Sequence, residues 1–217
     1  MPPNVLTYYK IEEVGGYDPL YSSRYEKFIT ALEKGDSAVS APLGYNRIIM
    51  PKNIDSPLLP LTNIKYIISL EEIYRYNLKK IMEEGQTKLY EYNLSLPRVY
   101  FACTVRSIPD QDIILQELFQ IDFIQNKIAL VEKAGLVSVQ NYDCDSNNVY
   151  ITDYQPSEVS FDYETSKDSY LIITSQFSPL WKAYLDGKQI RLDKVNYLFM
   201  GISVPTGNHA VRLIAGI

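Results

Sequence analysis

The sequence predicts an α+β protein in which an N-terminal mixed α/β region, residues 1–147, packs against a C-terminal antiparallel β-sandwich of jelly-roll or Ig-like type, residues 148–217. Three observations predict this class. After residue 148 the chain reads as short strands separated by turn residues, which is typical of sandwiches. Before it, apolar residues at helical spacing alternate with strand-like runs. The polar, turn-rich residues 141–148 separate the two patterns and mark the predicted boundary.

The composition is that of a globular protein and argues against one class of partner. With 217 residues, 46% of them hydrophobic and 22% charged, the chain is long enough to bury a core and too apolar to be disordered. Its net charge of −5 argues against a nucleic-acid binder, which would carry a basic patch. Tyrosine is frequent, with 19 residues against 7 phenylalanines and 1 tryptophan. Tyrosine suits half-buried strand faces, the interpretation we favour, and it also suits binding surfaces.

Local signals predict one helix near the N-terminus. Ser22 or Ser23 is a suitable N-cap, because a serine side chain can accept a hydrogen bond from a free backbone N–H of the first turn. The apolar residues that follow recur at helical spacing: Tyr25, Phe28, Ile29 and Leu32. Gly35 directly after Lys34 is a common helix stop, since glycine adopts the left-handed backbone that ends many helices.

The rest of the N-terminal region shows weaker patterns. Residues 4–16 indicate a strand and a turn, and residues 36–62, with four prolines, an irregular segment that is either packed down or functional. Residues 63–69 are nearly continuously apolar and predict a central strand. The remaining predictions are a helix over 71–83, an edge strand over 87–93, a strand over 96–105, and one or two short helices within 110–135.

The C-terminal region is predicted to contain strands throughout. They cover residues 149–154, 158–165, 169–176, 181–187, 188–193, 196–204 and 209–215. Asp186-Gly187 is the strongest hairpin signal, because both central residues of a two-residue turn need positive φ. A second turn is predicted at Thr206-Gly207.

Cysteine and histidine usage predicts neither a metal site nor a cofactor. Cys103 and Cys144 show no metal-ligand spacing, and a bridge between them outside the cytoplasm and two free thiols are both compatible with the sequence. His209 has no Cys or His partner nearby in sequence and is expected to be a surface or strand residue. A Ser-His-Asp triad would have to use it, and no other feature points there, so no catalytic residue is predicted.

The sequence contains no clear membrane or export signal. No apolar run approaches the ~18–20 residues that a transmembrane helix needs. The N-terminus lacks the basic and apolar parts of a signal peptide. These features alone predict a soluble cytoplasmic protein, although a region cut from a larger membrane protein would look the same.

Five residues are candidate ligand-binding residues, each with a structural interpretation that we favour. Tyr17, Asp18 and Arg24 form a polar cluster in which arginine could hold a carboxylate or phosphate, and an Asp-Arg pair that fixes the helix start is preferred. Arg98 is expected to form an ion pair at a strand entry rather than a phosphate clamp. Trp181 is expected to fill the sandwich core beside the hairpin, although an exposed indole could stack on a sugar ring.

Several motifs in the C-terminal region share their order and spacing with a known family. They are Asp153-Tyr154-Gln155-Pro156-Ser157, Leu171-Ile172-Ile173-Thr174-Ser175, Trp181-Lys182-Ala183-Tyr184-Leu185-Asp186-Gly187, and Gly201-Ile202-Ser203-Val204-Pro205-Thr206-Gly207-Asn208-His209. Together they resemble the extracytoplasmic C-terminal region of YfhO-type bacterial multi-pass membrane proteins, which are similar to the glycosyltransferase-C superfamily. One departure is Leu180, which stands where family members usually have glycine, so the turn before Trp181 must be made differently.

The resemblance extends into the N-terminal half. Gly16-Tyr17-Asp18-Pro19-Leu20, Asn63-Ile64-Lys65-Tyr66-Ile67-Ile68 and Leu96-Pro97-Arg98 are similar to family segments in the same order. The acidic residues that the family is thought to use in catalysis lie before this region, so none can be assigned here.

The resemblance therefore implies a non-catalytic region on the extracytoplasmic face of the cell membrane. Its expected partners are the transmembrane portion of the same polypeptide and a glycan or lipid-linked sugar. Its expected role is to cover the membrane-side active site or to hold the acceptor. The alternatives are a free-standing carbohydrate-binding β-sandwich module and, less favoured, a hydrolase.

Overall fold

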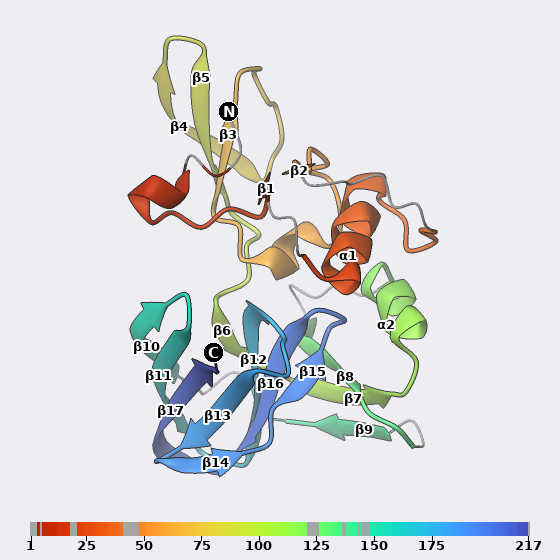
Figure 1. The fold of residues 1–217 in the computed structure, drawn as a ribbon, viewed down its shortest axis with the longest axis vertical. Helices are drawn as coiled ribbons and strands as arrows, with labels where there is room; N and C mark the ends of the chain where they lie inside the picture. The colour runs from red at the N-terminus through yellow and green to blue at the C-terminus, as the bar shows by residue number, and fades with distance from the viewer. Residues whose placement is uncertain are drawn as a thin grey trace. The chain divides into compact units, whose positions relative to one another are not determined.

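The computed structural model describes residues 4, 6–17, 21–40, 48–120, 126–135, 138–142, 144 and 148–216. The fold is mostly β, with 45% strand, 15% helix and several sheets (Figure 1). The chain divides into two compact units, Met1–Leu96 (unit 1) and Pro97–Ile217 (unit 2). Within the described ranges no helix is both long enough and apolar enough to cross a membrane.

The units meet between Leu96 and Pro97, whereas the predicted boundary after residue 147 falls inside unit 2. The reason is strand pairing over long sequence distances. Strand β6 (Val99–Phe101) pairs with β12 (Ser169–Gln176), and β8 (Ile128–Glu132) pairs with β15 (Asp193–Val195). Strands from both sides of residue 147 therefore belong to one sheet, which a local sequence pattern cannot reveal.

Unit 1 contains the predicted helix, α1 (Ser23–Lys34). Ser22 is its N-cap, and its side chain accepts a hydrogen bond from Tyr25 N at 3.2 Å. Gly35 ends the helix with a φ of 68°, in the left-handed region. Of the apolar residues that predicted the helix, Phe28, Ile29 and Leu32 are buried.

The remaining short elements of unit 1 lie before and after α1. They are η1 (Leu6–Tyr9), β1 (Gly16–Tyr17), β2 (Ile48–Ile49), which pairs with β1, and η2 (Leu59–Thr62). The proline-rich segment packs down in the part that the structure describes, since Leu58, Leu59 and Leu61 are buried. Residues 41–47 lie outside the described residues.

A three-stranded antiparallel sheet completes unit 1, and its order corrects three predictions. The order is β3 (Tyr66–Ser69), β5 (Thr87–Tyr92), β4 (Leu78–Glu84). The predicted central strand, β3, lies at an edge, and the predicted edge strand, β5, lies at the centre. The predicted helix over 71–83 is wrong, because a two-residue turn with Gly85 at φ 57° pairs β4 with β5 as a hairpin.

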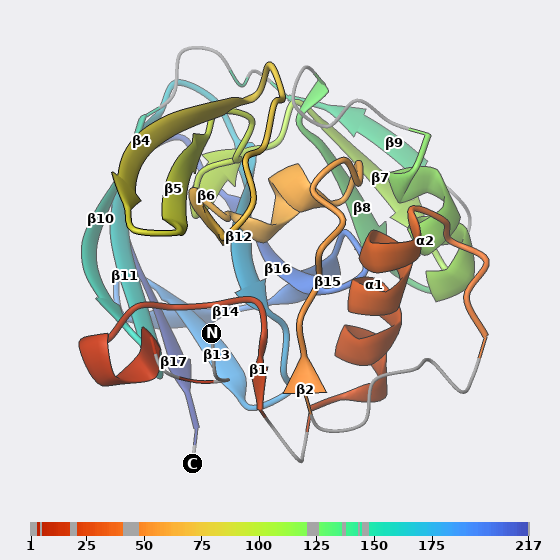
Figure 2. The same ribbon diagram turned by 90° about the horizontal axis from the view of Figure 1, so that it is seen from above.

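Unit 2 is built from two sheets (Figures 1 and 2). The seven-stranded sheet has the order β6-β12-β16-β15-β8-β7-β9, and the five-stranded sheet the order β10-β11-β17-β13-β14. The strands not yet bounded are β7 (Thr104–Ile108), β9 (Ser138–Asn141), β10 (Asn148–Gln155), β11 (Glu158–Thr165), β13 (Trp181–Leu185), β14 (Lys188–Ile190), β16 (Phe199–Val204) and β17 (Gly207–Ala215). The predicted strand over 96–105 is thus two strands, β6 and the start of β7.

One pairing in unit 2 is parallel, that of β7 with β8. The helix between them is α2 (Gln111–Leu118), whose N-cap Asp110 accepts a hydrogen bond from Asp112 N at 2.7 Å. Of the predicted helical stretch over 110–135, α2 and Asn126 are helical, residues 121–125 lie outside the described residues, and β8 begins at Ile128. A parallel pair needs such a crossover, which accounts for the switch from helix to strand.

The two sheets of unit 2 share one hydrophobic core. The seven-stranded sheet contributes Val99, Phe101, Leu171, Ile173, Met200, Ile202 and Val204, and the five-stranded sheet contributes Val159, Phe161, Tyr163, Ala183, Val211 and Leu213. In both views β10, β11 and β17 lie together on one side and β7, β8 and β9 on the other. The alternation of buried and exposed residues along β11 places every second side chain in this core.

Cys103 and Cys144 form a disulfide bond, with their Cα atoms 5.0 Å apart. Cys103 lies in the turn between β6 and β7, and Cys144 lies between β9 and β10. Of the two alternatives that the sequence allowed, the structure shows the bridge.

Candidate functional site

The N-terminal candidate cluster is only partly described. Asp18 and the side chain of Tyr17 lie outside the described residues. Arg24 is half-buried in the first turn of α1. The predicted Asp18–Arg24 pair therefore stays a prediction.

Arg98 lies at the entry to β6 and contacts two other segments of unit 2. Its guanidinium carbon is 4.7 Å from the ring centroid of Tyr154, and its Nη1 donates a hydrogen bond to Thr174 O at 3.3 Å. Thr174 in turn donates from its backbone N to Arg98 O at 2.9 Å. The arginine of the Leu-Pro-Arg motif and the tyrosine of the Asp-Tyr motif are thus brought together, in a cation–π contact that holds β6, β10 and β12 in place.

Trp181 is the first residue of β13, opposite Ala215 of β17. Its side chain is half-buried and packs against the shared core. The turn before it closes without glycine, because Ser178 accepts hydrogen bonds from Trp181 N through its carbonyl and from Leu180 N through its Oγ. This position favours a packing role over an exposed stacking platform.

Two motifs that are separate in sequence meet at one end of unit 2, through Asp186 and His209. His209 Nδ1 lies 2.6 Å from Asp186 Oδ2, and His209 Nε2 lies 3.0 Å from Thr206 O. Asp186 Oδ1 also accepts a hydrogen bond from Ala210 N at 3.0 Å. Asp186 and Gly187 have φ values of 48° and 80°, which confirms the predicted two-residue hairpin.

The partners of His209 determine its charge. A carboxylate and a backbone carbonyl are both acceptors, so the ring can donate to both only when both nitrogens carry protons. The hydrogen bond to Asp186, and then that to Thr206, raise the pKa of His209. The pKa of Asp186 is lowered, first by the hydrogen bond from His209 and then by that from Ala210. In this state His209 has no free lone pair to act as a general base, and its effect is to tie the two turns together.

The neighbours of His209 extend this cluster to a third turn. The Tyr163 ring centroid lies 5.5 Å from that of His209, and the Tyr163 hydroxyl donates to Pro205 O at 3.1 Å. Thr206 N donates to Asp168 Oδ1 at 3.1 Å. The sequence contained these motifs, but their contact depends on the antiparallel pairing of β17 with both β11 and β13, which local signals do not reveal.

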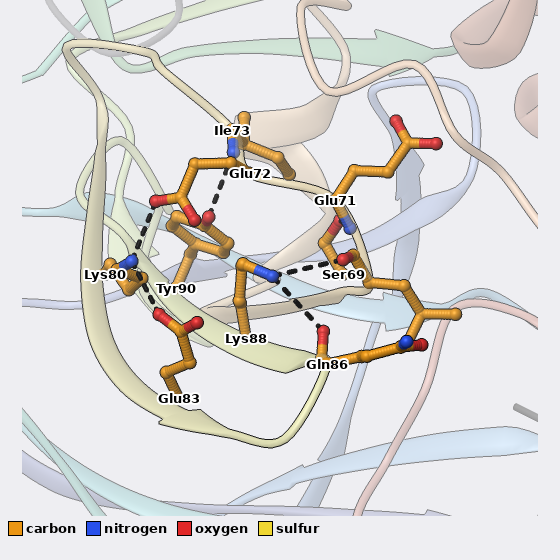
Figure 3. A network of polar contacts seen from close by, with 10 residues as sticks. Ser69, Glu71, Glu72, Ile73, Lys80, Glu83, Gln86, Lys88 and Tyr90 are labelled. Atoms are coloured by element: carbon orange, nitrogen blue, oxygen red, sulfur yellow. Dashed lines mark hydrogen bonds and ion pairs between the residues drawn. The ribbon is translucent and has the colours of Figure 1, made fainter.

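A second polar network covers one face of the three-stranded sheet of unit 1 (Figure 3). Lys80 Nζ lies 2.8 Å from both Glu72 Oε1 and Glu83 Oε2, and these two carboxylates raise the pKa of Lys80. The Tyr90 hydroxyl accepts a hydrogen bond from Ile73 N at 2.9 Å, and Lys88 Nζ donates to the carbonyl of residue 70 at 3.2 Å. The backbone of residues 70–73 is thereby held to this face, on which Tyr90 is buried.

Among the residues that the structure describes, no group of three or more His, Cys, Asp or Glu side chains is placed to hold a metal ion.

Comparison with known proteins identifies one family. Residues 141–214 match the family model described as "Bacterial membrane protein YfhO". The matched residues include β10–β16 and β17 up to Ile214, with Trp181, the Asp186-Gly187 hairpin and His209, so the resemblance stated from the sequence is confirmed for this part of the chain. No curated protein and no solved structure matches the chain.

Proposed function

We propose, from the match of residues 141–214 to a family of bacterial membrane proteins, that this chain is a non-catalytic, extracytoplasmic region of a multi-pass membrane protein similar to lipid-linked-sugar glycosyltransferases. The match is the observation that carries the proposal. Its partner is the transmembrane portion of the same polypeptide. In this proposal the two sheets of unit 2 form a β-sandwich of the jelly-roll or Ig-like type, supported by the core they share.

The disulfide bond supports the extracytoplasmic side. Disulfides persist in oxidising compartments and are rare in the cytosol, where thiols are kept reduced. Cys103 and Cys144 are bridged across two connections of unit 2 that are 41 residues apart in sequence. A cytoplasmic location would leave this cross-link reduced.

The role of the region is to cover the membrane-side active site or to hold the acceptor glycan. The Asp186–His209 contact supports a structural role for these two residues, because the Asp186 carboxylate is hydrogen-bonded to the His209 ring and to the backbone N of Ala210. The packing of Trp181 against the core does not favour the alternative, a free-standing carbohydrate-binding module with this indole as its platform.

Labelling of an introduced cysteine in intact cells tests the location. Lys188 is exposed on β14, so Lys188→Cys in the full-length membrane protein supplies a reactive thiol while the native pair stays bridged. A membrane-impermeant maleimide is expected to label the variant before lysis. Labelling only after the membrane is permeabilised would contradict the extracytoplasmic location.

Titration with glycan distinguishes the two proposed roles, holding the acceptor glycan and covering the membrane-side active site. The probe is the oligosaccharide fraction released from the host cell envelope, added to the isolated chain and followed by NMR. Saturable shifts on unit 2 support the holding of an acceptor. The absence of shifts, with the labelling result positive, supports the covering role.

A further inference from the structure

The face of the unit 1 sheet opposite the network of Figure 3 carries apolar side chains in register. Ile68 of β3 is paired with Leu89 of β5, and Leu89 is paired with Met82 of β4. Directly paired residues of an antiparallel sheet point to the same face. The three side chains therefore form one apolar row that crosses the whole sheet.

This row is exposed. Ile68 is 45% exposed and Met82 is 55% exposed, while Leu89 between them is half-buried. Along β3, Tyr66 lies on the same side as Ile68 and is 51% exposed. A contiguous set of large apolar side chains in water is the usual mark of an interaction surface.

Charged side chains of both signs flank the apolar row on the same face. On one side the next paired row is Tyr66, Glu91 and Lys79. On the other side Thr87 is paired with Glu84. Lys79 and Glu84 thus lie on the same edge strand, β4, one on each side of Met82. We call these residues, with the apolar row, the exposed sheet face.

We propose that the exposed sheet face binds a second copy of the same face. A two-fold axis that runs across the strands along the apolar row places Ile68, Leu89 and Met82 over their own counterparts. The same rotation exchanges the two flanking rows, which lie two residues, or ~7 Å, from the axis along β5. On β4 Lys79 is three residues from Met82, because the register shifts between Lys80 and Met82. The rotation therefore brings Lys79 over Glu84 of the second copy, and Glu84 over Lys79 of the second copy.

The exchanged rows are complementary in the central strand, β5, as well. Glu91 meets Thr87 of the second copy, whose hydroxyl can donate a hydrogen bond to the carboxylate. An isologous dimer requires a self-matching surface of this kind, in which each contact occurs twice.

The mixed charges favour a protein surface over a lipid surface as the occupant. An apolar centre with a polar rim of both signs is the usual anatomy of a protein interface. A membrane surface would instead leave Glu84 and Glu91 facing lipid headgroups. The net charge of −5 also disfavours adhesion to anionic lipid.

The size of the face sets the expected affinity. Stable protein interfaces bury ≈ 800 Å² on each partner, which is more than three short strands offer, so the association is weak and transient. Anchoring two copies in one membrane would raise their effective concentration and promote pairing without any new contact. This inference concerns unit 1 and does not depend on the function proposed for the whole chain.

Charge exchange tests the geometry. In sedimentation equilibrium the wild-type chain is expected to self-associate as concentration rises. Lys79→Glu and Glu84→Lys each turn two attractive contacts into two repulsive ones, and each variant alone is expected to dimerise about tenfold more weakly. An equimolar mixture of the two variants restores both attractions, and it is expected to form a heterodimer at least as strong as the wild-type dimer.

Two further variants complete the test. Leu89→Glu places a charge at the centre of the apolar row and is expected to abolish association, with circular dichroism to check that the chain is folded. Lys188→Glu, an exposed charge reversal in unit 2, is the matched control and should leave association unchanged. A chain that stays monomeric at every concentration overturns the proposal, as does self-association that neither charge variant weakens or that the mixture fails to restore.

Discussion

Opening the Cys103–Cys144 bridge should destabilise unit 2 by a predictable amount. The bridged residues are 41 apart in sequence, and closing a loop of that length removes enough conformational entropy from the unfolded chain to stabilise the fold by about 4 kcal/mol. The double substitution Cys103→Ser/Cys144→Ser should remove this stabilisation. Cys144→Ser alone should have nearly the same effect, because either change opens the loop.

The assay is urea denaturation followed by tryptophan fluorescence. The chain has a single tryptophan, Trp181, which packs against the core of unit 2, so its emission reports unfolding of that unit alone. With a denaturant dependence of about 2 kcal/mol/M, the loss corresponds to a midpoint lowered by about 2 M urea. The reduced wild-type chain should behave like the double variant.

Two results would refute this reasoning. If oxidised and reduced wild-type chains had the same midpoint, the bridge would not constrain the unfolded chain as argued. If the double variant still lost stability on addition of reductant, the effect of the reductant would have another origin. The slope of the transition serves as the control, since a changed slope would show that the unfolded state had become more or less compact.

Three further changes test the polar contacts of unit 2. His209→Gln should lower the melting temperature most between about pH 4 and pH 6.5. Because folding raises the pKa of His209, its stabilisation is complete below the pKa of His209 in the unfolded chain and is lost as the pH rises through its pKa in the folded chain. Because folding lowers the pKa of Asp186, its stabilisation is lost as the pH falls through the pKa of Asp186 in the folded chain. A melting-temperature difference that does not shrink at alkaline pH would contradict the ion pair. Gly207→Ala should lower the free energy of unfolding by about 1–3 kcal/mol, because Gly207 has a φ of 121° and an added Cβ would lie 2.9 Å from His209 Nε2. An unchanged urea midpoint would show that the turn relaxes to accept the methyl group. Asn196→Ala should cost about 1–3 kcal/mol, because the buried Asn196 Oδ1 accepts from Leu130 N at 2.8 Å; loss of amide-exchange protection at Leu130 is the matching readout, and retained protection would argue against the contact.

The features predicted from the sequence were those whose cause is local. Helix α1 follows from Ser22 as a cap, apolar spacing and Gly35 as a stop, all within one segment. The hairpin at Asp186 follows from the backbone freedom of the next residue, Gly187, and the position of that turn was predicted correctly. Each of these signals acts over a few residues, where propensity and hydrogen bonding decide the conformation.

The features missed from the sequence depend on pairing between distant segments. The apolar run of β3 resembled a buried central strand, yet β3 is an edge strand, and Tyr66 and Ile68 lie on a sheet face that leaves them exposed. Stretches of Ile, Leu and Val fit helix and strand alike, which is why β8 was included in a helical region. The contact of Asp186 with His209 required knowing that β13 lies beside β17, a choice that no local signal encodes.

The position of β17 has a consequence for the order in which the chain can fold. This strand, Gly207–Ala215, lies between β11 and β13 in the five-stranded sheet, so neither neighbour can complete its pairing before β17 is present. Unit 1, in contrast, contains a sheet formed by β3, β4 and β5 alone, and it can form earlier. Non-local pairing of this kind slows folding. During synthesis, the five-stranded sheet of unit 2 therefore cannot be completed until β17 is available, and Cys103 stays a thiol or a transient mixed disulfide until Cys144, 41 residues later, is present to pair with it.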